Sequence, residues 1–133
     1  MTFLSRHESL AYTALRVVAG ILFALHGAQK LFGLFGGKPV ELMTQKGLGG
    51  VIELVCGLLI AVGLATRPAA ILASGTMAVA YFQFHWKLEM NALKWVPLVN
   101  KGELAAIYCF LFLFIACRGA GRHSVDERLA GPR

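Results

Sequence analysis

Four long apolar segments constrain the fold of this chain more than any other feature. They cover approximately residues 10–35, 47–65, 68–86 and 102–117. Each approaches the ~20 residues with which an α-helix crosses the ~30 Å hydrocarbon core of a bilayer. Glycine, proline and lysine interrupt them in "GLFGGKP" and "KWVPLVNKG", and Pro68 is typical of the first turn of a new helix. The sequence predicts an all-α membrane protein, a bundle of four transmembrane helices.

The composition supports this interpretation. Hydrophobic residues make up 57% of the chain and charged residues 15%, against ~25% charged residues in soluble domains. A soluble domain of 133 residues has too little interior to bury so much apolar surface. We therefore expect one membrane domain, residues 1–133, with no removable signal peptide. The net charge of +6 comes without a basic run interleaved with aromatic residues, so nucleic acid is not an expected partner.

Arginine and lysine separate between the two sides of the predicted membrane domain. The N-terminus, the turn at Arg67 and the tail of residues 118–133 contain every arginine, whereas the other two connections contain the lysines. Arg16, Arg67 and Arg118 mark the membrane face on the arginine side. The excess of positive charge on that side is small, but it predicts that both termini lie in the cytoplasm.

Several polar residues lie inside the apolar segments, and their distance along the helix from these arginines gives each an approximate height. At ~1.5 Å per residue, Lys30, Glu53 and Glu103 all lie at roughly 21–22 Å. Gln83 lies at ~24 Å, His85 at ~27 Å and His26 at ~15 Å, with Gln29 beside Lys30. Charges are costly in hydrocarbon unless they face one another or water. We therefore expect Lys30, Glu53 and Glu103 to be catalytic groups in one outward-opening cavity, and His26, Gln29, Gln83 and His85 to be ligand-binding groups.

Simpler interpretations of the same residues remain open. A Lys30–Glu53 ion pair can serve only to fix the register of two helices, and His26 can be a core histidine bonded to a backbone carbonyl. His85 and Glu89 share one helical face, but no compact motif indicates a metal site. The three cysteines have neither disulfide-framework nor zinc-type spacing. Glu53, Gly57 and Ala61 follow one another four residues apart, which predicts a small-residue stripe where another helix approaches closely.

Three stretches carry a resemblance to a known family: "RVVAGILFALHGAQKLFG", "GGVIELVCGLLIAVGLATRPAA" and the C-terminal "GAGRHSVDERL". Together they resemble the DoxX family of small bacterial membrane proteins over nearly the whole chain. Val125 stands where leucine is common in the family's Gly-x-Gly-x-x-Ser-x-Asp ending. The resemblance implies a four-helix bundle in the bacterial cytoplasmic (inner) membrane with both termini inside. It also implies redox chemistry, since the related DoxD subunit couples thiosulfate oxidation to quinone.

Two classes of function follow. The first is a quinone-linked oxidoreductase or its membrane subunit, in which a quinone is the expected cofactor, because the sequence has no haem, flavin or iron–sulfur motif. The second is a non-catalytic scaffold or a small-solute carrier. The expected partners are the lipid bilayer and a small hydrophobic or quinone-like ligand, together with a second copy of the chain or a redox enzyme.

Overall fold

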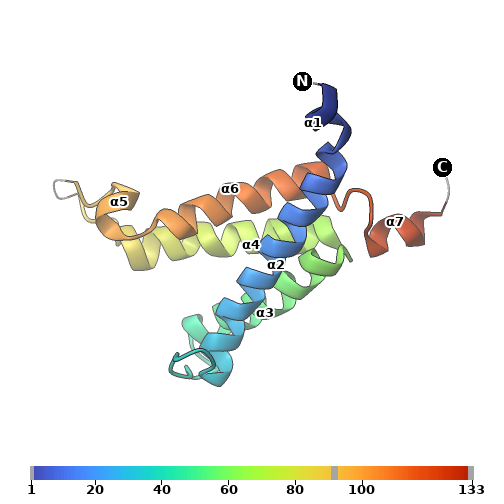
Figure 1. Ribbon diagram of the computed structural model, residues 1–133. Coiled ribbons are helices and arrows are strands. Elements are labelled where there is room, and N and C mark those ends of the chain that lie inside the picture. The colour runs from blue at the N-terminus through green and yellow to red at the C-terminus, as the bar shows by residue number, and fades with distance from the viewer. Residues whose placement is uncertain (1, 91–92, 132–133) are drawn as a thin grey trace.

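The computed structural model describes residues 2–90 and 93–131, and this part of the chain is helical without strands. The last two residues of the predicted tail therefore lie outside the described residues. The elements are α1 (Thr2–Arg6), α2 (Glu8–Phe32), α3 (Gln45–Val62), α4 (Thr66–Ala80), the π-helix η1 (Tyr81–Trp86), α5 (Pro97–Asn100), α6 (Glu103–Arg118) and α7 (Val125–Ala130) (Figure 1). The predicted all-α fold is confirmed.

The four long helices match the four predicted apolar segments, with shifted ends. α2 and α3 stop at Gly33 and Gly63, which take the left-handed conformation at φ 66° and 74° and end the helices before residues 35 and 65. α4 begins at Thr66 rather than at Pro68, and the proline occupies its first turn, where no amide partner is lost. The short helices α1, α5 and α7 were not predicted, because none has a long apolar period.

Helix length bears on the predicted membrane spans. Among the described residues, α2 with 25 residues and α3 with 18 are long and apolar enough to cross a membrane. α4 and α6 have 15 and 16 residues, and α4 continues directly into the six residues of η1. Two candidate spans are thus present, and four spans stay a prediction.

The long helices form two antiparallel pairs, α2 with α3 and α4 with α6. Figure 1 shows the pairs meeting near the end that holds both termini and diverging toward the opposite end. Large buried side chains fill the contact between the pairs, among them Phe23, Ile60, Phe112 and Ile115. Phe23 of α2 packs on the ring of Phe112 of α6, with centroids 4.7 Å apart. The divergence leaves room between α3 and the far end of α4.

Two arginines bind the C-terminal ends of neighbouring helices at the end that holds the termini. Arg16 is fully buried and its Nη1 donates to the carbonyls of Ile60 and Ala61 in α3, at 2.7 and 2.8 Å. Arg67 donates in the same way to the carbonyls of Ala116 and Cys117 in α6, at 2.9 and 2.8 Å. The last carbonyls of a helix lack intrahelical donors and carry partial negative charge, so a guanidinium suits both positions. Arg16 therefore holds helices together inside the protein rather than marking its surface.

The segment of residues 119–126, here called the C-terminal clasp, folds back over this end. The hydroxyl of Tyr12 donates to the carbonyl of Gly119 at 2.5 Å, and Arg16 donates to that of His123 at 3.1 Å. Asp126 accepts hydrogen bonds from the amides of Ala65 and Thr66, at 2.8 and 2.9 Å, and so caps α4. The ending that resembles the DoxX pattern thus ties α2, α3 and α4 together.

Candidate functional site

A partly buried ion pair lies at the end of the molecule opposite the clasp. Nζ of Lys30, in the last turn of α2, is 2.6 Å from Oε1 of Glu53 in α3. Glycines bring the two helices together at this level, because a Cβ on Gly27 or Gly57 would overlap the facing backbone. The predicted meeting of Lys30 with Glu53 and the predicted small-residue contact at Gly57 are therefore both present.

The two members of this pair differ in their access to solvent. The Lys30 side chain is 40% exposed, whereas that of Glu53 is only 3% exposed. Oε2 of Glu53 is buried and has no hydrogen-bond partner among the described residues. Buried polar atoms in proteins nearly always have such a partner. The carboxylate is therefore only half satisfied by the protein around it.

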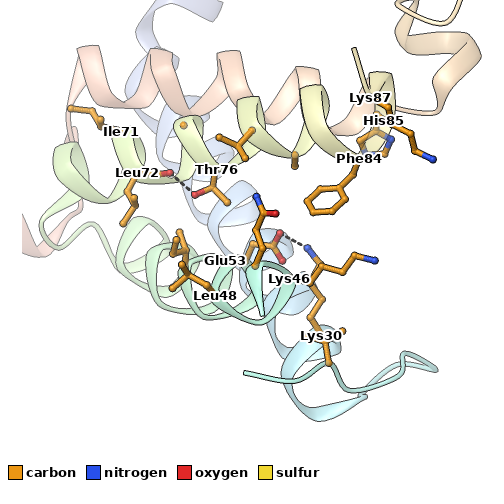
Figure 2. Close-up of a pocket in the computed structure, with 17 residues that line it drawn as sticks. Lys30, Lys46, Leu48, Glu53, Ile71, Leu72, Thr76, Phe84, His85 and Lys87 are labelled. Carbon is orange, nitrogen blue, oxygen red and sulfur yellow. Dashed lines mark hydrogen bonds and ion pairs between the residues drawn. The ribbon is translucent and has the colours of Figure 1, made fainter. Parts of the chain in front are cut away.

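Glu53 lies in the wall of a cavity of about 850 Å³ between α3 and the α4–η1 segment. Figure 2 shows Lys30 and Glu53 pointing toward one another on one side, with Phe84, His85 and Lys87 on the other. Apolar side chains make up most of the remaining wall: Leu48, Ile52, Ile71, Leu72 and Val79. The site is a mostly apolar hollow with a few polar groups, which is typical of small-molecule sites.

The outer part of the cavity is positively charged. Lys46 and Lys87 both line it, and neither forms an ion pair within the described residues. Nζ of Lys46 lies 5.5 Å from the centre of the Phe84 ring, a cation–π distance. Because Lys30 is neutralised by Glu53, the two other lysines give the cavity a net positive charge. Sequence reasoning missed both lysines, since Lys46 directly precedes one apolar segment and Lys87 directly follows another, as ordinary flanking residues do.

The π-helix η1 presents the far wall of this cavity. It carries Phe84 and His85, and short π-helical turns are frequent at functional sites. His85 lines the cavity, and its Nδ1 lies 3.3 Å from the carbonyl oxygen of Asn100. Gln83 does not line the cavity, but its side chain accepts a hydrogen bond from Gln45, which does line it. The structure therefore places His85 in the same cavity as the ion pair, on the opposite wall, and Gln83 beside the lining residue Gln45.

Three predicted site residues lie outside the cavity. Glu103 is exposed in the first turn of α6, away from Lys30 and Glu53, and makes no ion pair within the described residues. His26 is exposed and meets Tyr108 edge-on, with centroids 6.5 Å apart. Gln29 donates to the carbonyl of Phe35 at 3.4 Å in the loop after α2. Equal height does not bring these residues together, because height says nothing about the direction in which a side chain leaves its helix.

Metal binding finds no support in the geometry. Throughout residues 2–90 and 93–131, no group of three or more His, Cys, Asp or Glu side chains is arranged to hold a metal ion. His85 lines the cavity, whereas Glu89, on the same helical face in the sequence prediction, does not. The residues that can hold a small organic ligand are Lys30, Lys46, Glu53 and His85.

Similarity to known proteins shows the family to which the chain belongs. The DoxX family pattern matches residues 11–86, more than half of the sequence. The chain belongs to the DoxX family. A Haemophilus influenzae protein described as uncharacterized is 35% identical over 132 residues, which cover 96% of this chain and 97% of that protein. No solved structure matches the sequence.

The DoxX match identifies the chain as a membrane protein and coincides with the cavity. The matched residues run from the start of α2 through η1, so they include Lys30, Glu53 and His85. Glu103 and the C-terminal clasp lie beyond the match. The DoxX part of this chain therefore forms the ion pair and all of the cavity lining except Lys87.

Proposed function

We propose that this DoxX protein is a membrane redox protein whose cavity binds the head group of a quinone-type carrier. The observation that carries the proposal is the half-satisfied carboxylate of Glu53, paired with Lys30 in the wall of an apolar cavity. A cavity of about 850 Å³ is within the usual size of ligand sites. The residues present thus fit a flat, largely apolar molecule with polar oxygens.

Each polar wall residue has a chemical task in this proposal. The ammonium of Lys30 has three donors and uses one on Glu53, so others remain for a ligand oxygen. Lys46 supplies a further donor, and His85, whose Nδ1 donates to the carbonyl of Asn100, presents Nε2 of its neutral ring as an acceptor. The carboxylate of Glu53 is placed to accept or return a proton, the role of a general base. A bound quinone supplies the redox chemistry itself, because it exchanges two electrons and two protons.

The proposal includes a membrane arrangement of four spans. α4 and η1 together form a continuous helical stretch of residues 66–86, long enough to accompany α2 and α3 across the bilayer. α6, with 16 residues, crosses only where the bilayer thins or Glu103 reaches the interface. We place both termini in the cytoplasm of a bacterium with this protein in its inner membrane, so that the cavity opens outward.

Cysteine labelling of intact cells tests the orientation. Lys38 and Arg122 are exposed at opposite ends of the molecule, and each is replaced by cysteine. Native Cys117 is exposed and is first replaced by serine. A membrane-impermeant maleimide is expected to label position 38 from outside and position 122 only after lysis. Labelling of position 122 in intact cells contradicts the orientation.

The purified protein tests the ligand. Organic extraction and an ultraviolet spectrum are expected to reveal a co-purifying quinone. Titration with a short-chain quinone analogue is expected to give saturable binding that Lys30→Met weakens. If no quinone is extracted and no analogue binds, the non-catalytic scaffold or carrier function is the better conclusion.

A further inference from the structure

The unpartnered oxygen of Glu53 restricts which ligand the cavity can take. Glu53 is 2% exposed, and its Oε1 already accepts the hydrogen bond from Lys30. Oε2 lacks a donor among the described residues, although the group lies in the wall of a cavity. A carboxylate paired with an ammonium is purely an acceptor. What is missing at Oε2 is therefore a hydrogen-bond donor.

Two other polar side chains of the cavity wall are already engaged elsewhere. The hydroxyl of Thr76 donates to the carbonyl of Leu72 in its own helix, at 2.8 Å. The amide of Gln45 is directed to Gln83. Neither hydroxyl nor amide is thus directed at Oε2. The lysines and His85 of the wall also leave Oε2 without a hydrogen bond. A hydroxyl group of a ligand in the cavity can supply the donor, as water can.

We infer that the cavity binds a hydroxyl-bearing aromatic molecule whose O–H donates to Glu53. The inference rests on the proposed function and deepens it, because it selects the hydroquinone form of the carrier over the quinone. A quinone has only acceptor oxygens, so one placed beside Oε2 leaves two acceptors facing each other. A hydroquinone supplies the missing donor at the same position.

The lysines of the cavity wall do not distinguish a hydroquinone from a quinone. Lys46 and Lys87 are donors, and the oxygen of a hydroquinone accepts a hydrogen bond as the oxygen of a quinone does. The selection between the two forms therefore lies at Glu53. Because Glu53 is 2% exposed and the wall around it is mostly apolar, a hydrogen bond to this carboxylate is stronger than one made in solvent.

Three ligands with one common alkyl tail test the inference: a hydroquinone, its quinone and its dimethyl ether, which keeps the shape but has no donor. Binding is measured to the purified full chain, without oxygen so that the hydroquinone stays reduced. The hydroquinone is expected to bind about tenfold or more tightly than either of the others, as a hydrogen bond to a charged group implies. In Glu53→Met the preference is expected to disappear.

The outcomes separate the inference from the function on which it rests. Equal binding of hydroquinone and ether to the wild-type protein means that water satisfies Oε2, and this overturns the inference while the quinone-type site stands. Tighter binding of the quinone also overturns it, because Glu53 then acts as a donor. Binding of none of the three ligands overturns the proposed function as well. The wild-type series decides even if Glu53→Met does not fold.

Discussion

Gly27 of α2 lies against the backbone of Leu54 of α3 so closely that a Cβ at position 27 would be 2.4 Å from the Leu54 nitrogen. Leu54 directly follows Glu53, and Gly27 precedes Lys30 by one helical turn. The two helices are therefore in backbone contact next to the ion pair, as they also are at Gly20 and Gly57. The absence of a side chain at Gly27 allows Lys30 and Glu53 to meet.

Gly27→Ala is expected to destabilise the protein despite the higher helix propensity of alanine. The added methyl group meets backbone atoms that cannot move aside singly, and overpacking of this kind costs ~1–3 kcal/mol. Thermal unfolding in detergent, followed by circular dichroism, measures the change. Gly49→Ala in α3 is the matched control, because its Cβ would have no atom within 4 Å. Equal melting temperatures for the two variants contradict the close contact.

Removing either member of the ion pair is expected to have unequal effects. Lys30→Met leaves a buried carboxylate without its partner, with a loss of up to ~3 kcal/mol. Glu53→Gln leaves an ammonium whose side chain is 40% exposed and reaches water, so that the loss is at most ~1 kcal/mol. The double variant is expected to recover part of the loss of Lys30→Met. Strictly additive free energies of unfolding argue against coupling of the two residues.

The sequence predicted the helices and the ion pair because both depend on local pattern and on distance along a helix. Lys30 and Glu53 lie at one height and also face one another across α2 and α3. Glu103 has the same predicted height but lies in the first turn of α6, a helix whose most extensive contact is with α4. Whether two side chains at one height meet depends on how the two helix pairs are oriented. The periodicity of the sequence does not predict that the pairs diverge.

The residues of the cavity wall could not be predicted from the pattern of apolar residues alone. The π-helical turn from Tyr81 to Trp86 alters the direction in which Phe84 and His85 leave their helix. Lys46 belongs to the first turn of α3, one residue before the predicted start of that segment. The buried role of Arg16 was missed because its partners are backbone carbonyls, which any sequence supplies.

Arg16→Lys is expected to destabilise the protein although it keeps the charge. The guanidinium bonds the carbonyls of Ile60, Ala61 and His123 from two nitrogens, and one ammonium cannot reach all three in that geometry. Loss of one or two such bonds in the interior costs ~1–3 kcal/mol. Arg6→Lys, at an exposed position in α1, is the control and is expected to leave the melting temperature unchanged. A tolerated Arg16→Lys contradicts the proposed helix tie.

Asp126 makes the stability contributed by the clasp depend on pH. Burial by itself raises the pKa of this carboxyl, but hydrogen bonds from the amides of Thr66 and Ala65 and the nearby Arg16 outweigh burial and lower the pKa. Its contribution is thus complete above the ordinary value of ~3.9 and is lost as the pH falls through the lower folded-state value.

Asp126→Asn therefore tests the clasp through a pH series. The variant is expected to lose ~1 kcal/mol at pH 7, as for the loss of a helix cap. The difference in melting temperature from the wild-type protein is expected to shrink as the pH falls below ~4. Glu127→Gln is the control, since its bond to the His123 amide needs only a carbonyl oxygen. A difference that persists unchanged at the lowest pH means that Asp126 does not act as a charged cap.

Photolabelling with an azidoquinone tests most directly whether the cavity between α3 and η1 is the ligand site. Mass spectrometry of the digested protein is expected to place the label within residues 45–53 and 71–87, which form the walls. Excess unlabelled quinone is expected to suppress it, as is Gly75→Leu, which fills the cavity from a position with open space around it. Label spread over exposed apolar positions of α6 such as Leu113, unaffected by competitor or by Gly75→Leu, contradicts a quinone site in this cavity.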